Sequence, residues 1–360
     1  MNKLDKKIIY VLGTKAQFIK CEYILHNLVK QNVDILILDT GQHKELTHKE
    51  LNESGLEYEY ISLSNNTKNI STIFGMIIWF FKIIFLVKQK EKLHGISHSM
   101  VHGDTVSTLI GLIFSKRNNI KTIHLESGYK SNNILKPFPE ELVRGIVSRF
   151  SDILVVDGDL QYDNISKFSK NKKIIRISRN TIYDSLHKFL DERISAFDNT
   201  LTVTIHRTEN IYNKKVLTSL VHLLIEIRSK YNFDKIQWFC HDVTLNMLKK
   251  YNLFIKLEKN DIVVRSLLTH EKFIKELINS KLVITDGGSI SEECSILGLN
   301  TIIWRDVVED SRYLNENVIL SEYDSATINN FIENLLEQRN ITTAVTSPSA
   351  ELVEKLLKII

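Results

Sequence analysis

The chain has 360 residues, of which 43% are hydrophobic and 25% are charged, and a formal net charge of +4. This composition argues against a disordered or fibrous protein and favours a soluble globular one, and the length predicts two domains. The small, scattered positive charge does not indicate a nucleic-acid partner. Because Cys21, Cys240 and Cys294 are far apart and form no CxxC pair, neither a disulfide framework nor a zinc cluster is expected. A reducing cytoplasm fits best, and the N-terminus shows no signal-peptide core.

Short apolar runs that are typical of strands alternate with helical patterns along the first half of the chain. The strand-like runs are KKIIYVL, DILIL, HSMVH, KTIHL and DILVV. Between them, stretches such as QFIKCEYILHNLVK and TVSTLIGLIFSK repeat with a helical period. This alternation predicts a parallel sheet with helices on both faces, in an N-terminal domain over residues 1–180.

One segment of this half, residues 70–87, is almost wholly apolar and is interrupted only by Gly75 and Lys82. A transmembrane helix needs roughly 17 to 25 such residues, so the segment reaches the lower limit of that length. Three interpretations are open: a buried helix or subunit contact, contact with a membrane surface, and a true span. The first is favoured because strand and helix patterns continue on both sides.

A second series of strand-like runs follows, namely LTVTI, KIQWF, DIVVR, KLVIT and NTIIW. The join is expected near residues 178–200, where no strand is predicted, and the second domain covers residues 181–345. Residues 346–360 predict an amphipathic helix that packs back on the body of the protein. The fold class is therefore α/β, with two doubly wound Rossmann-like domains.

Ligands of open parallel sheets bind beyond the carboxyl ends of the strands, and in this chain those ends carry polar motifs. The motifs are GTK, VHGDT, HLESG and PFPEELVR in the first half, and TIHRTEN and ITDGGSISEE in the second. Each has an ordinary structural interpretation when taken alone. A Gly-Gly-Ser run is commonly a turn with a helix cap, and acids such as Glu140 and Glu141 suit the first turn of a helix. His124 and His241 are typical of hydrogen-bonded histidines near strand ends. The co-occurrence of these motifs at successive strand ends favours a site.

In the second half, the residue types suit a nucleoside diphosphate. The amides of Gly288 and Ser289, with a helix dipole behind them, would bind the diphosphate, and Arg207 or Lys15 would add charge-assisted hydrogen bonds. A carboxylate at Glu292 or Glu293 would bond a ribose diol.

In the first half, three acids suggest proton transfer. Clustering of Asp104, Glu126 and Glu140 in a cleft is expected to raise their pKa values, so that a proton can be removed and returned near neutral pH. His206, from the other domain, would protonate a leaving phosphate or balance its charge.

Together these motifs resemble the UDP-N-acetylglucosamine 2-epimerases over nearly the whole chain. GTKAQFIK matches the family's opening motif, TGQH at 40–43 its second strand end, and NTIYDSL at 180–186 its interdomain segment. The PFPEE segment resembles the non-hydrolysing branch. The resemblance implies a GT-B-like fold with a UDP-sugar in a central cleft, a homodimer, and neither a nicotinamide cofactor nor a metal.

The reaction implied by the resemblance inverts C2 of a UDP-N-acetylhexosamine, for the synthesis of a surface polysaccharide. A base removes the C2 proton, UDP leaves by anti elimination to give a 2-acetamidoglucal, and UDP adds back after protonation of the opposite face. The implied catalytic residues are Asp104, Glu126, Glu140 and His206. The residues assigned to substrate binding are Gly13, Lys15, Lys20, Gln42, His43, Arg144, Arg207, His241, Gly287, Gly288, Ser289, Glu293 and Arg305.

The chain departs from the family pattern around these residues. Lys15-Ala16-Gln17 stands where the family usually has Arg-Pro-Glu, and lysine lacks arginine's bidentate fork. Thr208 replaces an arginine, Gly287-Gly288-Ser289 replaces Ser-Gly-Gly, Arg179 replaces a glycine, and YKSNN at 129–133 replaces a run that usually bears Arg-Thr-Gly. The catalytic acids are retained, so the resemblance predicts the reaction rather than the particular sugar. Two alternatives remain open: a glycosyltransferase of the same architecture, held at a membrane by residues 70–87, and a non-catalytic nucleotide-sugar-binding protein.

Overall fold

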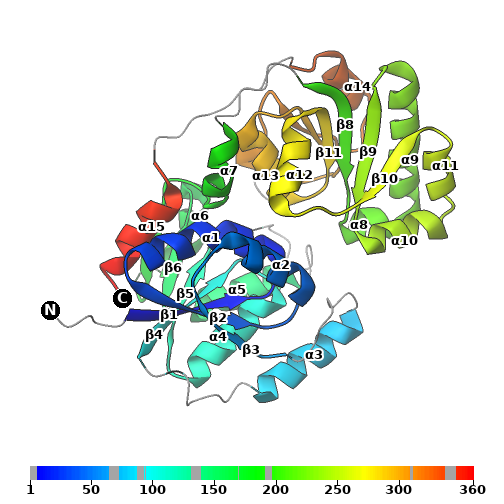
Figure 1. The fold of residues 1–360 in the computed structure, drawn as a ribbon. Coiled ribbons are helices and arrows are strands. Elements are labelled where there is room, and N and C mark those ends of the chain that lie inside the picture. Colours follow the sequence, from blue (N-terminus) through cyan, green and yellow to red (C-terminus); the bar gives the residue numbers. More distant parts are fainter. Residues whose placement is uncertain are drawn as a thin grey trace. The chain divides into compact units, whose positions relative to one another are not determined.

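The computed structural model describes residues 6–64, 73–86, 93, 95–130, 139–168, 170–190, 197–308, 311–336 and 346–360. The chain divides into two compact units. Unit 1 comprises Met1–Ser185 and Ala344–Ile360, and unit 2 comprises Leu186–Thr343. Each unit is a parallel sheet with helices packed on it (Figure 1), so the predicted α/β class with two Rossmann-like units is confirmed.

Unit 1 is built on a sheet whose described strands lie in the order β3-β2-β1-β4-β5-β6-β7, all in parallel pairs. Its strands are β1 (Lys6–Leu12), β2 (Val33–Asp39), β3 (Glu59–Ser62), β4 (Ile96–His102), β5 (Lys121–Leu125), β6 (Ile153–Val156) and β7 (Lys173–Arg176). Its helices are α1 (Lys15–Lys30), α2 (Lys44–Ser54), α3 (Ile73–Leu86), α4 (Val106–Arg117), α5 (Glu140–Phe150), α6 (Asp159–Ile165), a 3-10 turn (Ser166–Phe168) and α15 (Pro348–Leu357). Helix α7 (Ile182–Leu190) begins in unit 1 and ends in unit 2.

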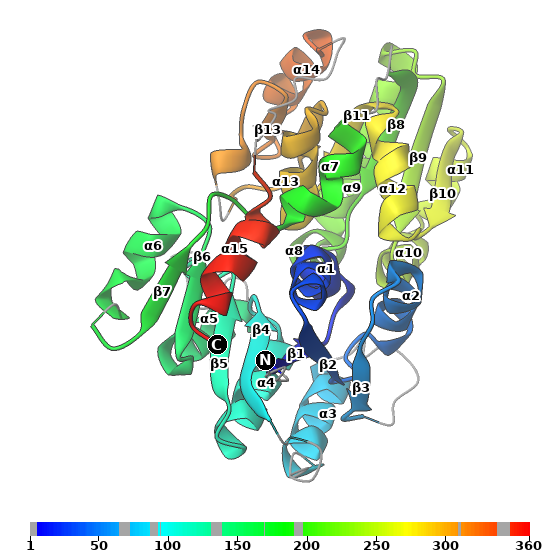
Figure 2. The ribbon, with the colours of Figure 1, turned by 60° about the vertical axis from the view of Figure 1, so that its left-hand side comes forward.

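Side chains of the central strand β1 point alternately to the two faces of this sheet and are buried on both. Ile8 and Tyr10 belong to a buried cluster with side chains of α1 and α15. Ile9 and Val11 belong to a second cluster with side chains of α3, α4 and α5. Successive side chains of a strand point to opposite faces. Because both faces are covered by helices, the strand needs a continuous apolar run, and KKIIYVL provides it. Figure 2 shows α15, in red, alongside α1.

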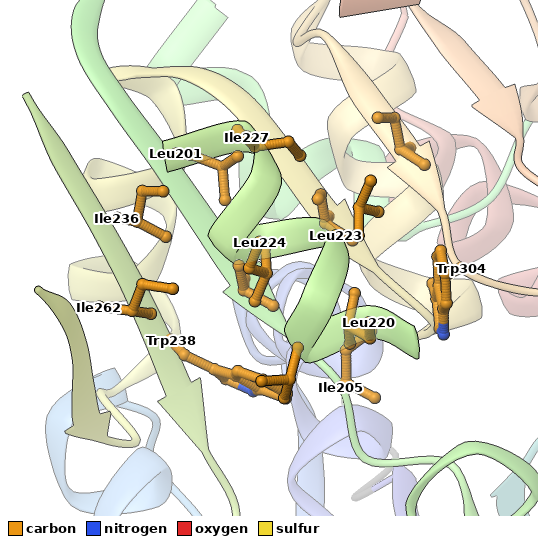
Figure 3. Close-up of a cluster of buried hydrophobic side chains, with 14 of the residues drawn as sticks. Leu201, Ile205, Leu220, Leu223, Leu224, Ile227, Ile236, Trp238, Ile262 and Trp304 are labelled. Atoms are coloured by element: carbon orange, nitrogen blue, oxygen red, sulfur yellow. The ribbon is translucent and has the colours of Figure 1, made fainter. Parts of the chain in front are cut away.

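Unit 2 repeats the same architecture, with described strands in the order β10-β9-β8-β11-β12-β13. Its strands are β8 (Asp198–Thr204), β9 (Lys235–Cys240), β10 (Ile262–Ser266), β11 (Ser280–Thr285), β12 (Thr301–Ile303) and β13 (Val318–Leu320). Its helices are α8 (Thr208–Ile211), α9 (Lys214–Lys230), α10 (Asp242–Lys250), α11 (Phe254–Glu258), α12 (His270–Ile278), α13 (Gly288–Leu297), a 3-10 turn (Ser311–Tyr313) and α14 (Ser325–Glu333). In its larger core, side chains of α9 pack on Leu201, Ile236 and Trp238 of the sheet (Figure 3).

The strand order places a reversal of winding at the centre of each sheet. In unit 1 the chain moves outward from β1 to β3 and then crosses to β4 on the other side of β1; unit 2 does the same with β8 and β11. At such a point the two adjacent loops run in opposite directions and leave a ligand-binding crevice at the carboxyl ends. The motifs after β1, β4, β8 and β11 therefore occupy the favoured positions of their own units.

The ten predicted strands are all present, and the described residues hold three further strands that the sequence patterns did not predict. The missed strands are β3, β7 and β13, whose sequences are EYIS, KIIR and VIL. All three lie at sheet edges, where fewer side chains are buried and a short apolar run suffices. The strand-free join at 178–200 was also slightly wrong, because β8 begins at Asp198.

The apolar segment folds as helix α3 over its described residues; residues 70–72 and 87 lie outside them. Trp79 and Ile83 are buried against the sheet, and the indole N–H of Trp79 donates to the Thr40 carbonyl at 3.0 Å. Ile77 and Phe81 are instead 50% and 55% exposed. None of the described helices combines the length and the apolar character needed to cross a membrane.

The C-terminal helix α15 should contribute to the stability of unit 1, because Leu356 is fully buried in the cluster that includes α1. Leu356→Ala is expected to lower the free energy of unfolding by about 2–5 kcal/mol through lost burial and the cavity left behind. Urea unfolding followed by circular dichroism measures it. Glu354→Ala, on the exposed face of the same helix, is the control and should change the free energy by less than about 0.5 kcal/mol. Equal effects of the two variants would contradict the packing of α15.

Candidate active site

The turn between β1 and α1 is organised by Gln17. Its side-chain oxygen accepts from the amides of Gly13 at 3.1 Å and Thr14 at 3.0 Å, and its side-chain amide donates to the His102 carbonyl at 2.7 Å. An ionised glutamate would accept the first two hydrogen bonds but has no proton for the third. The departure from the family's Glu at this position therefore fits its surroundings.

Gly13 is required at this turn for a steric reason. A Cβ on Gly13 would lie 2.0 Å from the Ser107 hydroxyl oxygen, so any side chain there would displace α4. Ser107 in turn donates to the side-chain oxygen of Gln42 at 2.6 Å. His43 lies next to Gln42, is half-buried, and has a pKa lowered by burial. The predicted residues Gly13, Gln42 and His43 thus share one end of the unit 1 sheet.

Lys15, predicted to bind phosphate, begins α1 and forms an ion pair with Glu50 of α2 at 2.9 Å. Lys20, one turn further along α1, is buried and contacts Glu126 Oε1 through its ammonium. The two lysines of the GTKAQFIK motif therefore have different carboxylate neighbours.

Glu126 occupies a left-handed backbone conformation, with φ of +58°, directly after β5. Its Oε1 accepts from Lys20 and from the Asn180 side-chain amide, the latter at 2.8 Å, and its Oε2 lies 3.7 Å from His102 Nδ1. Burial opposes its charge, but the lysine, the histidine and the two hydrogen bonds prevail and lower its pKa to about 2. The expectation that clustering raises the pKa of these acids is wrong for Glu126, because cations and donors surround it.

Asp104, after β4, is held by Arg144 of α5. The Arg144 guanidinium contacts Asp104 Oδ2 and donates to Glu141 Oε2 at 2.7 Å. Burial opposes its charge, yet Asp104, Glu141 and Glu126 together raise the pKa of Arg144. Arg144, predicted to bind substrate, is thus the counter-ion of a predicted catalytic acid.

Glu140 is the first residue of α5 and is half-buried. It lies one helical turn before Arg144, on the element that carries the counter-ion of Asp104. Arg144 contacts Asp104, and the charge of Glu126 helps to raise the pKa of this arginine. Glu140 lies on the same helix as Arg144.

His102 and His124 are buried at the ends of β4 and β5. His124 Nε2 lies 2.8 Å from the Gly103 carbonyl and its Nδ1 lies 3.3 Å from the Ser148 hydroxyl, and burial lowers its pKa to about 4. His124 is therefore a hydrogen-bonded structural histidine, as predicted. Burial also lowers the pKa of His102, which contacts Glu126 and was not among the assigned site residues.

In unit 2, the fully buried Asp286 organises the loop after β8. It accepts from the backbone amides of His206 and Arg207, each at 3.0 Å, and from the Asn210 side chain at 2.8 Å. Its Oδ1 also lies 3.3 Å from His206 Nδ1. The sequence signal for Asp286 was an acid that ends an apolar run, but it was not assigned to the site.

His206 is partly exposed and its ring lies 5.1 Å from that of His241. A Cβ on Gly287 would lie only 3.0 Å from His206 Cε1. The glycine that replaces the family's serine therefore fits the position of this imidazole. The structure brings together three predicted residues here, namely His206, His241 and Gly287.

Helix α13 begins at Gly288, with Gly287 at its N-cap and without a side-chain cap. The first amides of such a helix, together with its dipole, form an anion site. A Cβ on Gly288 would lie 3.8 Å from Arg207 Nη2, so the guanidinium reaches this end of the helix. Ser289 lies in the same first turn.

The acids of α13 are both buried and both hydrogen-bonded. Glu293 Oε1 lies 2.8 Å from His270 Nε2, and Glu292 accepts from the Tyr313 hydroxyl at 2.6 Å. Arg305, after β12, is also buried. Within the described part of the chain, no group of three metal-ligating side chains is placed to hold a metal ion.

A helix N-terminus that can bind an anion, and polar groups at the carboxyl ends of parallel strands, are typical of nucleotide-binding α/β proteins. The chain belongs to the UDP-N-acetylglucosamine 2-epimerase family, whose model matches residues 26–351. This finding supports the epimerase interpretation over that of a glycosyltransferase or a non-catalytic binding protein.

Curated relatives of known name match most of the chain. The UDP-N-acetylglucosamine 2-epimerase of Methanocaldococcus jannaschii is 29% identical over 324 residues, with 84% of each chain covered. The UDP-2,3-diacetamido-2,3-dideoxy-D-glucuronate 2-epimerase of Pseudomonas aeruginosa is 26% identical over 313 residues, again with 84% of each covered. The crystal structure of the M. jannaschii protein in complex with UDP-GlcNAc and UDP has a TM-score of 0.80 at 26% identity and covers 98% of this chain and 99% of that one.

The lowered pKa of Glu126 predicts how its contribution to stability depends on pH. The pKa is about 2 in the folded protein against an ordinary 4.5, so the ionised group stabilises the fold above pH about 4.5 and this contribution is lost as the pH falls toward 2. Glu126→Gln should lower the free energy of unfolding at pH 7, by roughly 3 kcal/mol at most, and the deficit should shrink on acidification.

Urea titrations from pH 7 to pH 3.5 measure this deficit. Glu53→Gln, on the exposed side of α2, is the matched control. A deficit for Glu126→Gln that stays constant over this range would show that its charge does not contribute.

Proposed function

We propose that the protein inverts C2 of a UDP-N-acetylhexosamine, interconverting UDP-N-acetylglucosamine and UDP-N-acetylmannosamine or modified relatives of them. The observation that carries this proposal is the carboxylate pair Asp104 and Glu126 at adjacent strand ends, each held by a cation, in a chain of this family. A relative named for a diacetamido-glucuronate sugar is almost as similar as one named for N-acetylglucosamine. Overall identity therefore does not select the sugar.

Unit 2 would bind the UDP moiety. The amides at the start of α13 and the guanidinium of Arg207 would bind the diphosphate, and buried Glu293 would accept from the ribose diol, as acids do in other nucleotide sites. Asp286 would hold His206 beside the departing phosphate, where the imidazole donates a hydrogen bond or a proton.

Unit 1 would carry the chemistry at C2. A carboxylate removes the C2 proton, the C1–O bond breaks, and UDP leaves with its electron pair to give a C1–C2 double bond. A proton is then delivered to the opposite face of C2 and UDP adds to C1. Glu126 is ionised at neutral pH, although its lowered pKa makes it a weaker base than an ordinary glutamate, and Arg144 contacts the Asp104 carboxylate.

The site assignment predicts large losses of turnover in single variants. Asp104→Asn, Glu126→Gln, Glu140→Gln and His206→Asn should each slow exchange of the C2 proton by ~100-fold or more, since they remove a proton-transfer group. Proton NMR with UDP-N-acetylglucosamine in deuterated water measures it, through loss of the C2 signal and growth of the manno-configured product.

Modified UDP-sugars are the next substrates to supply if the wild type shows no exchange. Absence of exchange with all of them would end the epimerase proposal. Retention of wild-type rates in a variant would remove that residue from the catalytic set.

The diphosphate role of Arg207 has its own test. Arg207→Ala should weaken UDP binding by about tenfold, because a charge-assisted hydrogen bond is lost, and calorimetric titration of UDP measures this. Arg265→Ala, on the edge strand β10, is the matched control and should leave the affinity unchanged. An equal affinity in both variants would contradict the role of Arg207.

We also propose that the protein works as a cytoplasmic homodimer that supplies a surface polysaccharide. The three cysteines are free and buried, as suits a reducing compartment. Ile77 and Phe81 are four residues apart and form one exposed apolar stripe on α3, which supports a subunit contact there.

Phe81→Glu should convert the dimer to a monomer, because a charge would be placed in an apolar interface. Light scattering after size exclusion gives the mass. Phe150→Glu replaces an equally exposed phenylalanine of α5 and should leave the dimer intact. A wild-type monomer, or wild-type protein that floats with liposomes through this stripe, would contradict the subunit contact.

A further inference from the structure

Asn180 joins Glu126 to the helix that leads into unit 2. Its side-chain amide donates to Glu126 Oε1 at 2.8 Å, while its side-chain oxygen accepts from the backbone amide of Ile182 at 3.0 Å, at the first residue of α7. Asn180 is 6% exposed, so these hydrogen bonds are shielded from water. One side chain thus serves the carboxylate and the helix start at the same time.

The next residue holds the other member of the ion pair. The hydroxyl of Thr181 donates to the backbone carbonyl of Lys20 at 2.6 Å, and Lys20 contacts the same Glu126 oxygen as Asn180. Two consecutive residues of one turn therefore fix both Glu126 and its cation.

Helix α15, near the C-terminus, forms hydrogen bonds to the residues on both sides of Asn180. Glu351 accepts from the backbone amide of Ser178 at 2.9 Å, and the Ser349 amide donates to Asp184 at 2.8 Å. Leu352 lines the same small hollow as Glu126 and Asn180. The turn is thus held before and after Asn180 by a helix of unit 1.

Glu126 needs such support because of its backbone. A non-glycine residue in the left-handed region costs of order 1 kcal/mol or more and persists only where its surroundings determine it. Glu126 has a φ of +58°. Its carboxylate contacts Lys20 and Asn180, and these contacts help to hold the residue in this conformation.

We propose that Asn180 is a positioning residue for the C2 chemistry: it orients the Glu126 carboxylate by donating to Oε1, and α15 keeps it in place. This inference rests on the proposed function. Asn180 does not have to touch the substrate for this role.

Other charged and titratable groups also act on Glu126 and have to be separated from Asn180. They are Lys20 and Cys21 of α1, His102 of β4, His124 of β5 and Arg144 of α5, together with Asp157 in the shared hollow and Tyr129, which contacts Asn180 and Asp157. Asn180, by contrast, is a neutral donor. Its replacement by an acid of the same shape removes the amide's hydrogen bonds to Glu126 and Tyr129 and adds one charge, without removing a cation.

Asn180→Asp is the decisive variant. An aspartate keeps the oxygen that accepts from Ile182, so α7 keeps its start, but a carboxylate oxygen now faces Glu126 in place of an N–H donor. Repulsion should raise the pKa of Glu126 by about one unit or more. The acid limb of the pH profile of kcat should move to higher pH by the same amount, and kcat at neutral pH should fall at least ~10-fold, with a smaller change in KM.

Asn213→Asp is the matched control, because Asn213 caps α9 of unit 2 with the same side-chain oxygen. It should leave the pH profile and kcat unchanged. Asn180→Ala, which removes every side-chain hydrogen bond of Asn180, should in addition lower the thermal midpoint. A merely structural role would show as lost stability without a displaced pH limb.

A carbon-13 NMR titration of the glutamate carboxyl groups measures the pKa of Glu126 without any turnover. The Glu126 signal is assigned by its absence in Glu126→Gln. A raised Glu126 titration together with a displaced pH limb in Asn180→Asp supports the proposal. Unchanged titration and unchanged kcat overturn it. If the wild type inverts no UDP-sugar, the proposed function fails, and the titration alone then decides whether Asn180 controls Glu126.

Discussion

The constraint on which the rest of the structure depends is the reversal of winding at the centre of each parallel sheet. It leaves the loops after β1 and β4, and those after β8 and β11, open at one edge. Polar groups can gather there because the strands behind them are buried on both faces, and the apolar runs of the sequence supply this burial. Each unit therefore gathers most of its candidate site residues near the centre of its sheet, and in unit 1 Asn180, which follows the edge strand β7, adds a contact to Glu126.

At these strand ends, each acid has a cation or hydrogen-bond donors next to it. Glu126 is held by Lys20 and Asn180, Asp104 by Arg144, and Asp286 accepts backbone amides around His206. A buried carboxylate without such partners would be neutral. The partners of Glu126 instead lower its pKa and keep it charged before any substrate arrives, so this carboxylate does not have to ionise at the moment of reaction.

Much of this was predictable from the sequence, and the reasons for the misses are physical. Continuous apolar runs identified the central strands, whereas β3, β7 and β13 are short edge strands whose patterns are weak. Strand-end motifs identified the candidate residues but not their partners, because Asn180 and Glu126 are separated by 53 intervening residues and meet only in the fold. For the same reason the direction of the Glu126 pKa shift could not be inferred from a count of nearby acids.

The departures from the family pattern also acquire a local explanation. Gln17 donates to a carbonyl that a glutamate could not serve, and Gly287 leaves room for the His206 ring. Both substitutions lie in contact with residues that the family resemblance marks as part of the site. The altered residues therefore fit their own surroundings while the acids are retained. A resemblance of this kind predicts proton transfer, which lies in the carboxylates, better than it predicts recognition, which lies in the contacts.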